Sequence, residues 1–325
     1  MSRALALAAL ASAAAWQGVA SGGTPVRLAL PWQHQAQFAG CYAAVAQGLY
    51  ARQGLDVTLV RGGPDRDPVG SLRRGEADAA VLLLTAALGA RQEGVDVVNC
   101  AQVVNRSNLM IVAWRDRGVR HAGDLDGRRL GMWEGPLAAP FLDFLAARGV
   151  RPVLVPQYSS VELFLRRGLD ACAAMEYNEY HRILQSGVDA EQLTVVRLRD
   201  AGAGIPEDGV YVTATFIRAH PGAAERLAAC TLAGWRWVAQ HRQEALELTM
   251  SYLRRDHVSG SRAQMRWMLD TLLPAIFPGP HDRWAFGVLD RGAYERAATL
   301  LVERGLLRAA PPYDAFRAAG GAGAP

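Results

Sequence analysis

A repeated supersecondary unit constrains the fold of this chain more than any other feature of its sequence. Residues 51–60 (ARQGLDVTLV) lead through a short helical segment and Arg-Arg-Gly to Asp78-Ala79. Residues 147–155 (ARGVRPVLV) lead in the same way, through Arg-Arg-Gly, to Asp170-Ala171. Each copy has the pattern of a helix end, a strand, a second helix and the start of another strand. A chain that builds this unit twice is most simply divided into two similar α/β lobes, and a single six-stranded sheet is the alternative.

The hydrophobic pattern around the repeat is that of a mostly parallel sheet flanked by helices. Short runs rich in Val, Ile and Leu alternate with longer Ala-, Leu- and Arg-rich runs of helical period. The length of 325 residues also suits two lobes better than one core. We expect strands at 26–30, 57–60, 79–83, 97–102 and 129–132, helices at 39–53 and 67–74, and mainly helices after residue 210.

The composition argues against several kinds of chemistry. Every basic residue other than histidine is arginine, so the chain can form no lysine Schiff base and has no lysine for a phosphate-binding loop. The net charge is only +4 and the arginines are interspersed with acidic residues, which does not favour nucleic acid as a partner. No cofactor is expected. The cysteines show no paired spacing, predict no metal site, and lie in apolar contexts that favour buried free thiols: Cys41, Cys100, Cys172 and Cys230.

Both ends of the chain are predicted to lie outside the folded unit. Residues 1–20 combine Arg3 with an apolar stretch and small residues before position 21, a pattern typical of a secretory signal peptide. We therefore expect a protein exported to the periplasm. The tail 311–325 is rich in Ala, Gly and Pro and is predicted to be disordered.

The loops that follow the predicted strands carry aromatic and amide side chains, where an ordinary βα loop needs only glycine and a helix cap. Ligands of α/β sheets bind beyond the carboxyl ends of the strands, aromatic faces can stack on a planar ligand, and amides both donate and accept hydrogen bonds. The residues predicted to contact a ligand are Trp32, Gln33, His34, Gln37, Phe38, Tyr42, Thr85 and Ser107 in the first lobe, and Trp133, Glu134, Tyr158, Glu176, Tyr177, Asn178 and Glu179 in the second.

A catalytic role is not favoured, and no catalytic residue is predicted. The sequence lacks a Gly-x-Ser-x-Gly elbow, a recognisable Cys/His pairing and the glycine fingerprints of nucleotide sites. His34 is the one histidine in a candidate loop. Glu134 and Glu176 could form a carboxylate pair, but in a stacking site they are expected to accept hydrogen bonds from ligand N–H groups.

Several motifs between residues 26 and 240 resemble those of one transport family. They are Trp32-x-x-x-Ala36-x-Phe38-Ala39-Gly40, Gly48-Leu49-Tyr50, Gly75-x-Ala77-Asp78, Tyr177-Asn178-Glu179 and Pro206-Glu207-Asp208-Gly209. In this combination the sequence is similar to the thiamine-pyrimidine and sulfonate/nitrate-type solute-binding proteins of ABC importers.

The resemblance implies the type II periplasmic binding protein fold, an α/β architecture of two lobes with a ligand cleft between them. The first lobe would comprise residues 21–112 and 212–310, and the second, residues 113–211, would be inserted with hinge strands near 109–113 and 210–214. It also implies a monomer that closes on a small molecule by hinge motion and delivers it to a permease in the inner membrane.

The solute is not determined by the resemblance. Relatives with an aromatic first loop resemble binders of planar heterocycles, either pyrimidine precursors of thiamine or a flavin such as riboflavin, and Trp32 and Tyr177 fit that use. A sulfonate or nitrate would instead need the donors of Arg106, Ser107 and Asn108. Two further alternatives are a sensor that docks to a membrane receptor, and a pyrimidine-synthase-like enzyme of the same fold. The chain departs from that enzyme because it lacks the required lysine and cysteine-rich segment.

Overall fold

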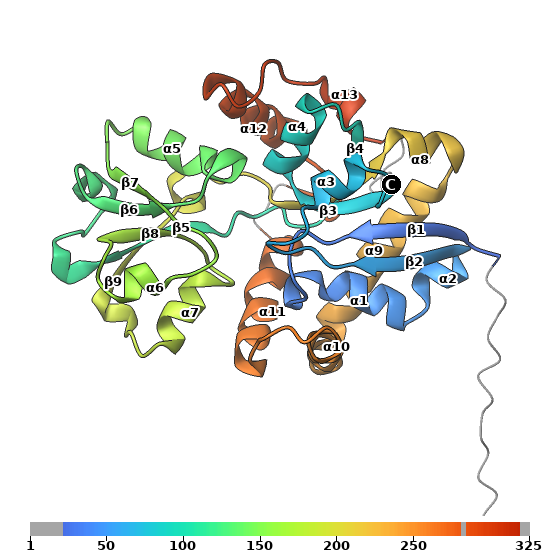
Figure 1. Cartoon of the computed structure of the whole chain (residues 1–325), viewed down its shortest axis with the longest axis horizontal. Coiled ribbons are helices and arrows are strands. Elements are labelled where there is room, and N and C mark those ends of the chain that lie inside the picture. Colours follow the sequence, from blue (N-terminus) through green and yellow to red (C-terminus); the bar gives the residue numbers. More distant parts are fainter. Residues whose placement is uncertain (1–21, 281–283, 319–325) are drawn as a thin grey trace, which may run out of the picture.

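The computed structural model describes residues 22–280 and 284–318, which form two lobes, each built on a five-stranded sheet (Figure 1). The strand order is β2-β1-β3-β10-β4 in lobe 1 and β7-β6-β8-β5-β9 in lobe 2. The strands of lobe 1 are β1 (Thr24–Ala29), β2 (Leu55–Val60), β3 (Ala79–Leu83), β4 (Val97–Gln102) and β10 (Asp208–Thr213). Those of lobe 2 are β5 (Leu109–Trp114), β6 (Arg129–Met132), β7 (Val153–Pro156), β8 (Ala171–Met175) and β9 (Leu193–Arg197).

The two sheets share one topology, which confirms the two-lobed α/β fold and excludes the single six-stranded sheet. In lobe 1, β1 pairs in parallel with β2 and β3, and β10 lies antiparallel between β3 and β4. In lobe 2, β6 pairs in parallel with β7 and β8, and β5 lies antiparallel between β8 and β9. The repeated sequence unit builds β2 and β3 in one lobe and β7 and β8 in the other.

The chain crosses between the lobes twice, through residues 103–108 and 198–207. These crossings lie a few residues before the predicted hinge strands at 109–113 and 210–214. The whole of β5 pairs with β8 and β9, and the whole of β10 pairs with β3 and β4. The predicted boundaries at 112/113 and 211/212 therefore fall inside strands whose hydrogen bonds commit them to one sheet.

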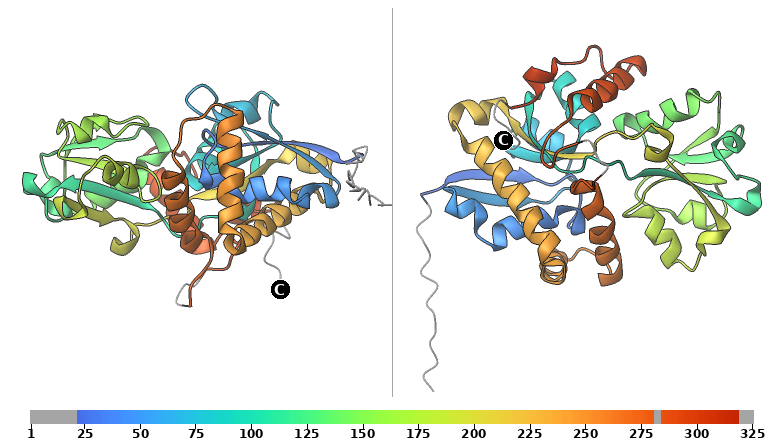
Figure 2. Two further views of the ribbon diagram at one scale, coloured as in Figure 1. Left: turned by 90° about the horizontal axis from the view of Figure 1, so that it is seen from below. Right: turned by 180° about the vertical axis from the view of Figure 1, so that it is seen from behind.

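Helices cover both faces of each sheet, and α9 runs across one face of the lobe 1 sheet, called sheet 1 below (Figure 2). The predicted helix 39–53 is broken at Gly48, whose φ of 61° is left-handed. Lobe 1 contains α1 (Ala39–Ala46), α2 (Leu49–Arg52), α3 (Pro68–Arg73), α4 (Leu84–Gln92), α8 (Ala214–Ala219), α9 (Ala223–Gln240), α10 (Arg242–Arg255), α11 (Arg262–Ile276), α12 (Arg291–Glu303) and α13 (Tyr313–Phe316). Lobe 2 contains α5 (Ala139–Ala146), α6 (Glu162–Leu165) and α7 (Glu179–Gln185).

The C-terminal segment is folded as far as residue 318, which corrects the predicted disorder of 311–325 for the described part. Phe316 is fully buried and packs on Tyr211 and Tyr294. The backbone N–H of Ala318 donates to the carbonyl of Asn99 at the edge of sheet 1 (2.9 Å). One buried aromatic ring and a sheet-edge hydrogen bond thus order a segment whose composition is that of a flexible tail.

Residues 1–20, predicted as a signal peptide, and residues 319–325 lie outside the described part of the chain. Among the described residues, no helix combines the length and the apolar character needed to cross a membrane.

Candidate functional site

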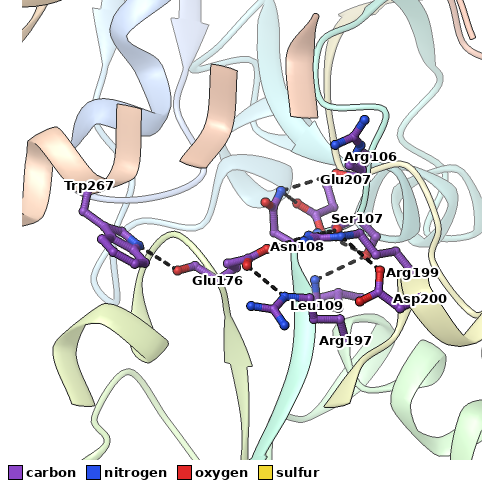
Figure 3. A network of polar contacts seen from close by, with 10 residues as sticks. All are labelled: Arg106, Ser107, Asn108, Leu109, Glu176, Arg197, Arg199, Asp200, Glu207 and Trp267. Carbon is purple, nitrogen blue, oxygen red and sulfur yellow. Dashed lines mark hydrogen bonds and ion pairs between the residues drawn. The ribbon is translucent and has the colours of Figure 1, made fainter. Parts of the chain in front are cut away.

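The two crossings meet at the junction between the lobes, where Glu207 ties one to the other (Figure 3). Its Oε1 accepts hydrogen bonds from the backbone N–H of Asn108 (2.5 Å) and from Ser107 Oγ (3.2 Å), and its Oε2 accepts from Asn108 Nδ2 (2.9 Å). Burial raises the pKa of Glu207 to about 7, although the Asn108 bonds act in the opposite direction. The donors of Ser107 and Asn108 are therefore occupied by a carboxyl group of the hinge.

A second carboxylate, Glu176 directly after β8, is neutralised by Arg197 at the end of β9 and Arg199 in the second crossing (Figure 3). Arg197 Nε donates to its Oε1 (2.9 Å), and Arg199 Nη1 donates to its Oε2 (2.5 Å) and to the carbonyl of Ser107 (3.0 Å). Burial would raise the pKa of Glu176, but the hydrogen bonds from Arg199 and Arg197 outweigh it and lower the pKa. The charge of Glu176 is thus balanced by Arg197 and Arg199, and the three side chains form part of the hinge.

Asp208 lies next to Glu207, and no arginine among the described residues balances its charge. Its side chain is almost fully buried, its Oδ2 accepts from Gln37 Nε2 (2.6 Å), and its Oδ1 has no hydrogen-bond partner. Burial raises the pKa of Asp208 to about 6. Gln37 is itself held because its Oε1 accepts a short hydrogen bond from Gln35 Nε2. Among the described residues, no arginine pairs with Asp208 or Glu207.

Tyr177 lies on the lobe 2 side of the junction. Tyr177 is 4% exposed, and burial raises its pKa, with further contributions from the negative charges of Asp208 and Glu207. Its backbone carbonyl accepts a hydrogen bond from Gln264 of α11, which places Tyr177 at the junction between the lobes. The junction therefore brings together Tyr177, the amide of Gln37 and the carboxyl groups of Asp208 and Glu207. Among the described residues, neither carboxyl group pairs with an arginine.

Contacts from α11 hold the lobes together on one side of the junction. Trp267 Nε1 donates to the backbone carbonyl of Glu176 (2.9 Å), and the indole stacks on His181 with ring centroids 4.5 Å apart. Gln264 Nε2 donates to the carbonyl of Tyr177 (3.3 Å) and to Asn178 Oδ1 (3.2 Å). On the other side, Arg304, directly after α12, pairs with Asp143 of α5 (2.9 Å).

Backbone donors at two helix starts near the junction are also occupied. The N–H groups of Ala36 and Gln37, in a short 3-10 helix (Ala36–Phe38), donate to the sulfur atoms of Met265 (3.3 Å) and Met268 (3.2 Å). The N–H of Leu84, at the start of α4, donates to the carbonyl of Glu207 (3.0 Å). Helix starts often bind anions through such groups, and these N–H groups already have partners.

Several predicted ligand contacts instead lie in the core of lobe 1. Phe38 and Tyr42 are fully buried, and Tyr42 stacks on Tyr252 with ring centroids 4.1 Å apart. His34 is buried between Tyr42 Oη and Asp256 Oδ2, each 2.9 Å from a ring nitrogen. Burial lowers the pKa of His34 in spite of the nearby Asp256 carboxylate. These side chains pack in the core of lobe 1, against the loop that follows β1, and do not face the other lobe.

The remaining predicted residues are divided between the junction, the lobe surfaces, the start of α4 and the turn that precedes α7. Gln37, Ser107, Glu176, Tyr177 and Asn178 are brought together at the junction. Trp32, Gln33 and Trp133 are half-buried, Thr85 is buried at the start of α4, and Glu134 and Tyr158 are exposed. Glu179 accepts from the N–H of Met175 (2.9 Å) and from Asn178 Nδ2 (2.7 Å), so its carboxylate is bonded within the turn between β8 and α7.

The predicted set omitted Asp208, Glu207, Gln264 and Trp267. The sequence does carry a signal for the first two, because adjacent acids directly before the apolar run of β10 are unusual at the start of a buried strand. It carries none for the two α11 residues, which read as part of an ordinary amphipathic helix.

The four cysteines are buried and unpaired, as predicted. Burial raises the pKa of both Cys41 and Cys100 to about 12, and it also raises those of Cys172 and Cys230. None of these thiols is placed to ionise at the junction. Within the described residues, no three His, Cys, Asp or Glu side chains converge as metal ligands would.

Comparison with solved structures shows the same two-lobed fold in transport proteins and in an enzyme. The aliphatic sulphonate-binding protein SsuA of Escherichia coli matches with a TM-score of 0.70 at 12% identity, covering 90% of this chain and 97% of that chain. The periplasmic sulfonate-binding protein SsuA of Methylobacillus flagellatus matches with a TM-score of 0.67 at 16% identity, covering 91% and 92%. The desulfurization enzyme DszB, in a cysteine-to-serine variant with biphenyl-2-sulfinic acid, matches with a TM-score of 0.62 at 14% identity, covering 91% and 96%.

At these identities the solved structures establish the fold and leave the ligand to other arguments. A search of curated protein sequences found no match. The sequence matches the model of the family described as NMT1/THI5 like over residues 35–245, which is well over half of the chain. The chain therefore belongs to the NMT1/THI5-like family.

Proposed function

We propose that this protein is the periplasmic solute-binding component of an ABC importer, that it acts as a monomer, and that its lobes close on a small planar heterocycle. The observation that carries the proposal is the junction itself. Two crossings form a hinge, Gln37 and Asp208 of lobe 1 are hydrogen-bonded to each other there, and Tyr177 of lobe 2 accepts a hydrogen bond from Gln264 of lobe 1 through its backbone carbonyl. Family membership supports the transport role, as do the SsuA structures, which are described as periplasmic binding proteins and, for Methylobacillus flagellatus, as part of an ABC transporter.

The charges at the junction favour a heterocycle with N–H groups over an anion. The Arg197 and Arg199 side chains are committed to Glu176, whereas Asp208 and Glu207 have no arginine partner among the described residues. An anion placed beside these acids would meet like charge in a poorly hydrated site. A planar heterocycle can instead stack on an aromatic ring and donate hydrogen bonds to a carboxylate.

A sulfonate or nitrate is the second candidate, because the matched SsuA proteins bind sulfonates according to their descriptions. Of the three residues proposed to donate to such an anion, Arg106, Ser107 and Asn108, the last two are bonded to Glu207. Anion binding would require the hinge to give up those bonds. A receptor-docking sensor would use the same ligand site and differ only in its membrane partner.

We also propose that the protein is not an enzyme. DszB shares the fold and is an enzyme in which a cysteine was substituted. Here all four thiols are buried with raised pKa values, and His34 is enclosed in the lobe 1 core. The groups at the junction are suited to hold a solute through hydrogen bonds and stacking.

The test begins with protein purified without refolding, from which any bound solute is released and identified by mass spectrometry. A thermal-shift panel of pyrimidines, flavins, sulfonates and nitrate follows, because a ligand that binds the folded state raises its melting temperature. We expect a heterocycle in the released material or stabilisation by one. Stabilisation only by small anions would contradict the proposed solute class.

A matched pair of variants links that binding to the site. Trp32→Ala removes a half-buried indole in the loop after β1, and Trp237→Ala removes a half-buried indole on α9. We expect loss of the heterocycle-induced shift in the first variant only. Tyr177 is a poorer choice for this test because its ring is buried, and truncation to Ala would also create a cavity.

A further inference from the structure

The unpartnered oxygen of Asp208 is the feature of the junction that its neighbours leave unexplained. A buried carboxyl group normally has its oxygens hydrogen-bonded or paired with a cation, because leaving them unsatisfied costs free energy. Asp208 is 3% exposed, yet only its Oδ2 has a partner, Gln37 Nε2 at 2.6 Å. Gln37 therefore fixes the orientation of the carboxyl group, and Oδ1 is free to accept a hydrogen bond.

The position of Asp208 places this oxygen where a solute would arrive. Its backbone carbonyl accepts from the N–H groups of Val103 and Val104, both at 2.9 Å, so the residue sits where the two crossings meet. Tyr177, whose pKa is raised in part by the charge of Asp208, belongs to the other lobe. Separation of the lobes would move Tyr177 and β8 away from Asp208, and closure would bring them back.

Among the described residues, no cation forms an ion pair with Asp208. The groups whose pKa is raised in part by the charge of Asp208 are Glu207, Tyr177, Tyr211 and Cys41, and none of them is a cation. Buried Tyr211 Oη also has no hydrogen-bond partner. The described residues therefore supply no donor to Asp208 Oδ1 in this arrangement of the lobes.

From this geometry we propose that Asp208 determines the specificity of the site by accepting a hydrogen bond from an N–H group of the solute, with Gln37 as the positioning residue. The solute class is a planar heterocycle with an exocyclic amine or a protonated ring nitrogen, and anions are repelled. This inference rests on the proposed solute-binding function and adds the group that recognises the ligand.

The test uses two probes that differ in one N–H group. 4-Amino-2-methylpyrimidine carries the exocyclic amine, and 2-methylpyrimidine lacks it; benzenesulfonate serves as a planar anion. Binding of each is measured by titration calorimetry to the wild-type protein, to Asp208→Asn and to the control Asp270→Asn. The control removes an exposed carboxylate from α11, away from the junction. Circular dichroism and thermal melts establish that each variant is folded.

We expect the wild type and Asp270→Asn to bind the aminopyrimidine more tightly than 2-methylpyrimidine. In Asp208→Asn the aminopyrimidine should bind about tenfold to a hundredfold more weakly, as expected for the loss of one hydrogen bond to a charged group, and the difference between the two pyrimidines should disappear. Gln37→Leu, which leaves the carboxylate in place but unheld, should show a smaller loss.

Two results would overturn the inference, and they can be distinguished. If Asp208→Asn binds the aminopyrimidine as tightly as the wild type, Asp208 does not recognise the solute, while the proposed function stands. If the wild type binds benzenesulfonate and neither pyrimidine, the proposed solute class and the role of Asp208 fail together.

Discussion

Three acidic residues at the junction have different protonation behaviour because their surroundings differ. Glu176 accepts hydrogen bonds from two arginines and has a lowered pKa, whereas buried Glu207 and Asp208 accept bonds only from uncharged groups and have raised values. The chemical group is the same in all three, so burial and the charge of the partner decide its state. The junction therefore contains one carboxylate that is ionised at neutral pH and two carboxyl groups whose pKa values are raised toward neutral pH.

A pH dependence of stability follows from Glu207. Its pKa in the folded protein is about 7, above the ordinary value of 4.5, so folding favours the protonated form. Its contribution to stability is fully present below about pH 4.5 and is lost as the pH rises through about 7. Glu207→Gln stays neutral at every pH. We expect the free energy of unfolding of the wild type, relative to this variant, to fall by up to about 1.4 kcal/mol per pH unit in that window.

The measurement is urea unfolding of both proteins at several pH values between 4 and 8. Glu134→Gln, at an exposed position, provides the control and should track the wild type. Parallel curves for Glu207→Gln and the wild type across the window would show that Glu207 is ionised in the folded protein.

Close backbone packing between α1 and α9 forms the support beneath the loop after β1. A Cβ atom on Gly234 would overlap the carbonyl oxygen of Gly40, and one on Gly40 would overlap the Trp235 ring. Neither residue has a left-handed φ, so glycine is required by proximity and not by conformation.

We therefore expect Gly234→Ala to destabilise the protein by about 1 to 3 kcal/mol through overpacking. Gly89→Ala in α4 is the matched control, since its new Cβ would lie at an ordinary 3.6 Å from Pro136 Cγ. That variant should be neutral or more stable, because alanine has the higher helix propensity. Thermal unfolding compares the two, and equal melting temperatures would contradict the close-packing explanation.

Helix α11 contacts both lobes. Met265 and Met268 accept backbone N–H groups of lobe 1, and Trp267 contacts Glu176 and His181 of lobe 2. The indole N–H is thus one of the bonds that must break when the lobes separate.

Trp267→Phe keeps an aromatic ring but removes this donor, so we expect the ligand-free protein to shift toward a more open arrangement by about threefold to tenfold. Small-angle X-ray scattering would report this as a larger radius of gyration. Trp237→Phe is the control, because Trp237 makes a similar stack with His241 (4.6 Å) entirely within lobe 1. An unchanged radius in Trp267→Phe would mean that the contact does not restrain the lobes.

At the scale of the whole molecule, lobe 1 is completed by residues far apart in the sequence. Sheet 1 takes β10 from beyond the inserted lobe, and its edge at β4 is covered by the C-terminal segment, where Arg317 bridges to Asn99. The stability of lobe 1 therefore depends on the last described residues of the chain.

Phe316→Ala should destabilise the protein by about 3 to 5 kcal/mol, as for other large core rings, because the side chain is fully buried. Leu154→Ala in β7, a position that is 47% exposed, should cost much less. Chemical denaturation measures both. A small effect of Phe316→Ala would indicate that the C-terminal segment packs only loosely in solution.

Much of the architecture could be predicted from local patterns in the sequence. The repeated βα unit indicated two lobes, and the apolar runs gave β3, β4 and β6 with their observed bounds. Periodicity and glycine positions are local properties, because strand and helix periods depend only on neighbouring residues. Pro312 and the Ala/Gly-rich composition misled at the C-terminus, where one buried ring, Phe316, outweighs the tendency of its neighbours to remain disordered.

The tertiary structure decided which of the strand-end residues meet. Sequence patterns located the loop after β1, but Tyr42 and His34 turned inward to Tyr252 and Asp256, more than two hundred residues later in the chain. Asp208 reached the junction only because β10 pairs between β3 and β4, which sets the crossing before it. Partner choice between distant segments depends on sheet order and burial, and a linear pattern contains neither. The sequence alone thus determined the two-lobed α/β fold, and the packing of the lobes decided which side chains can recognise a solute.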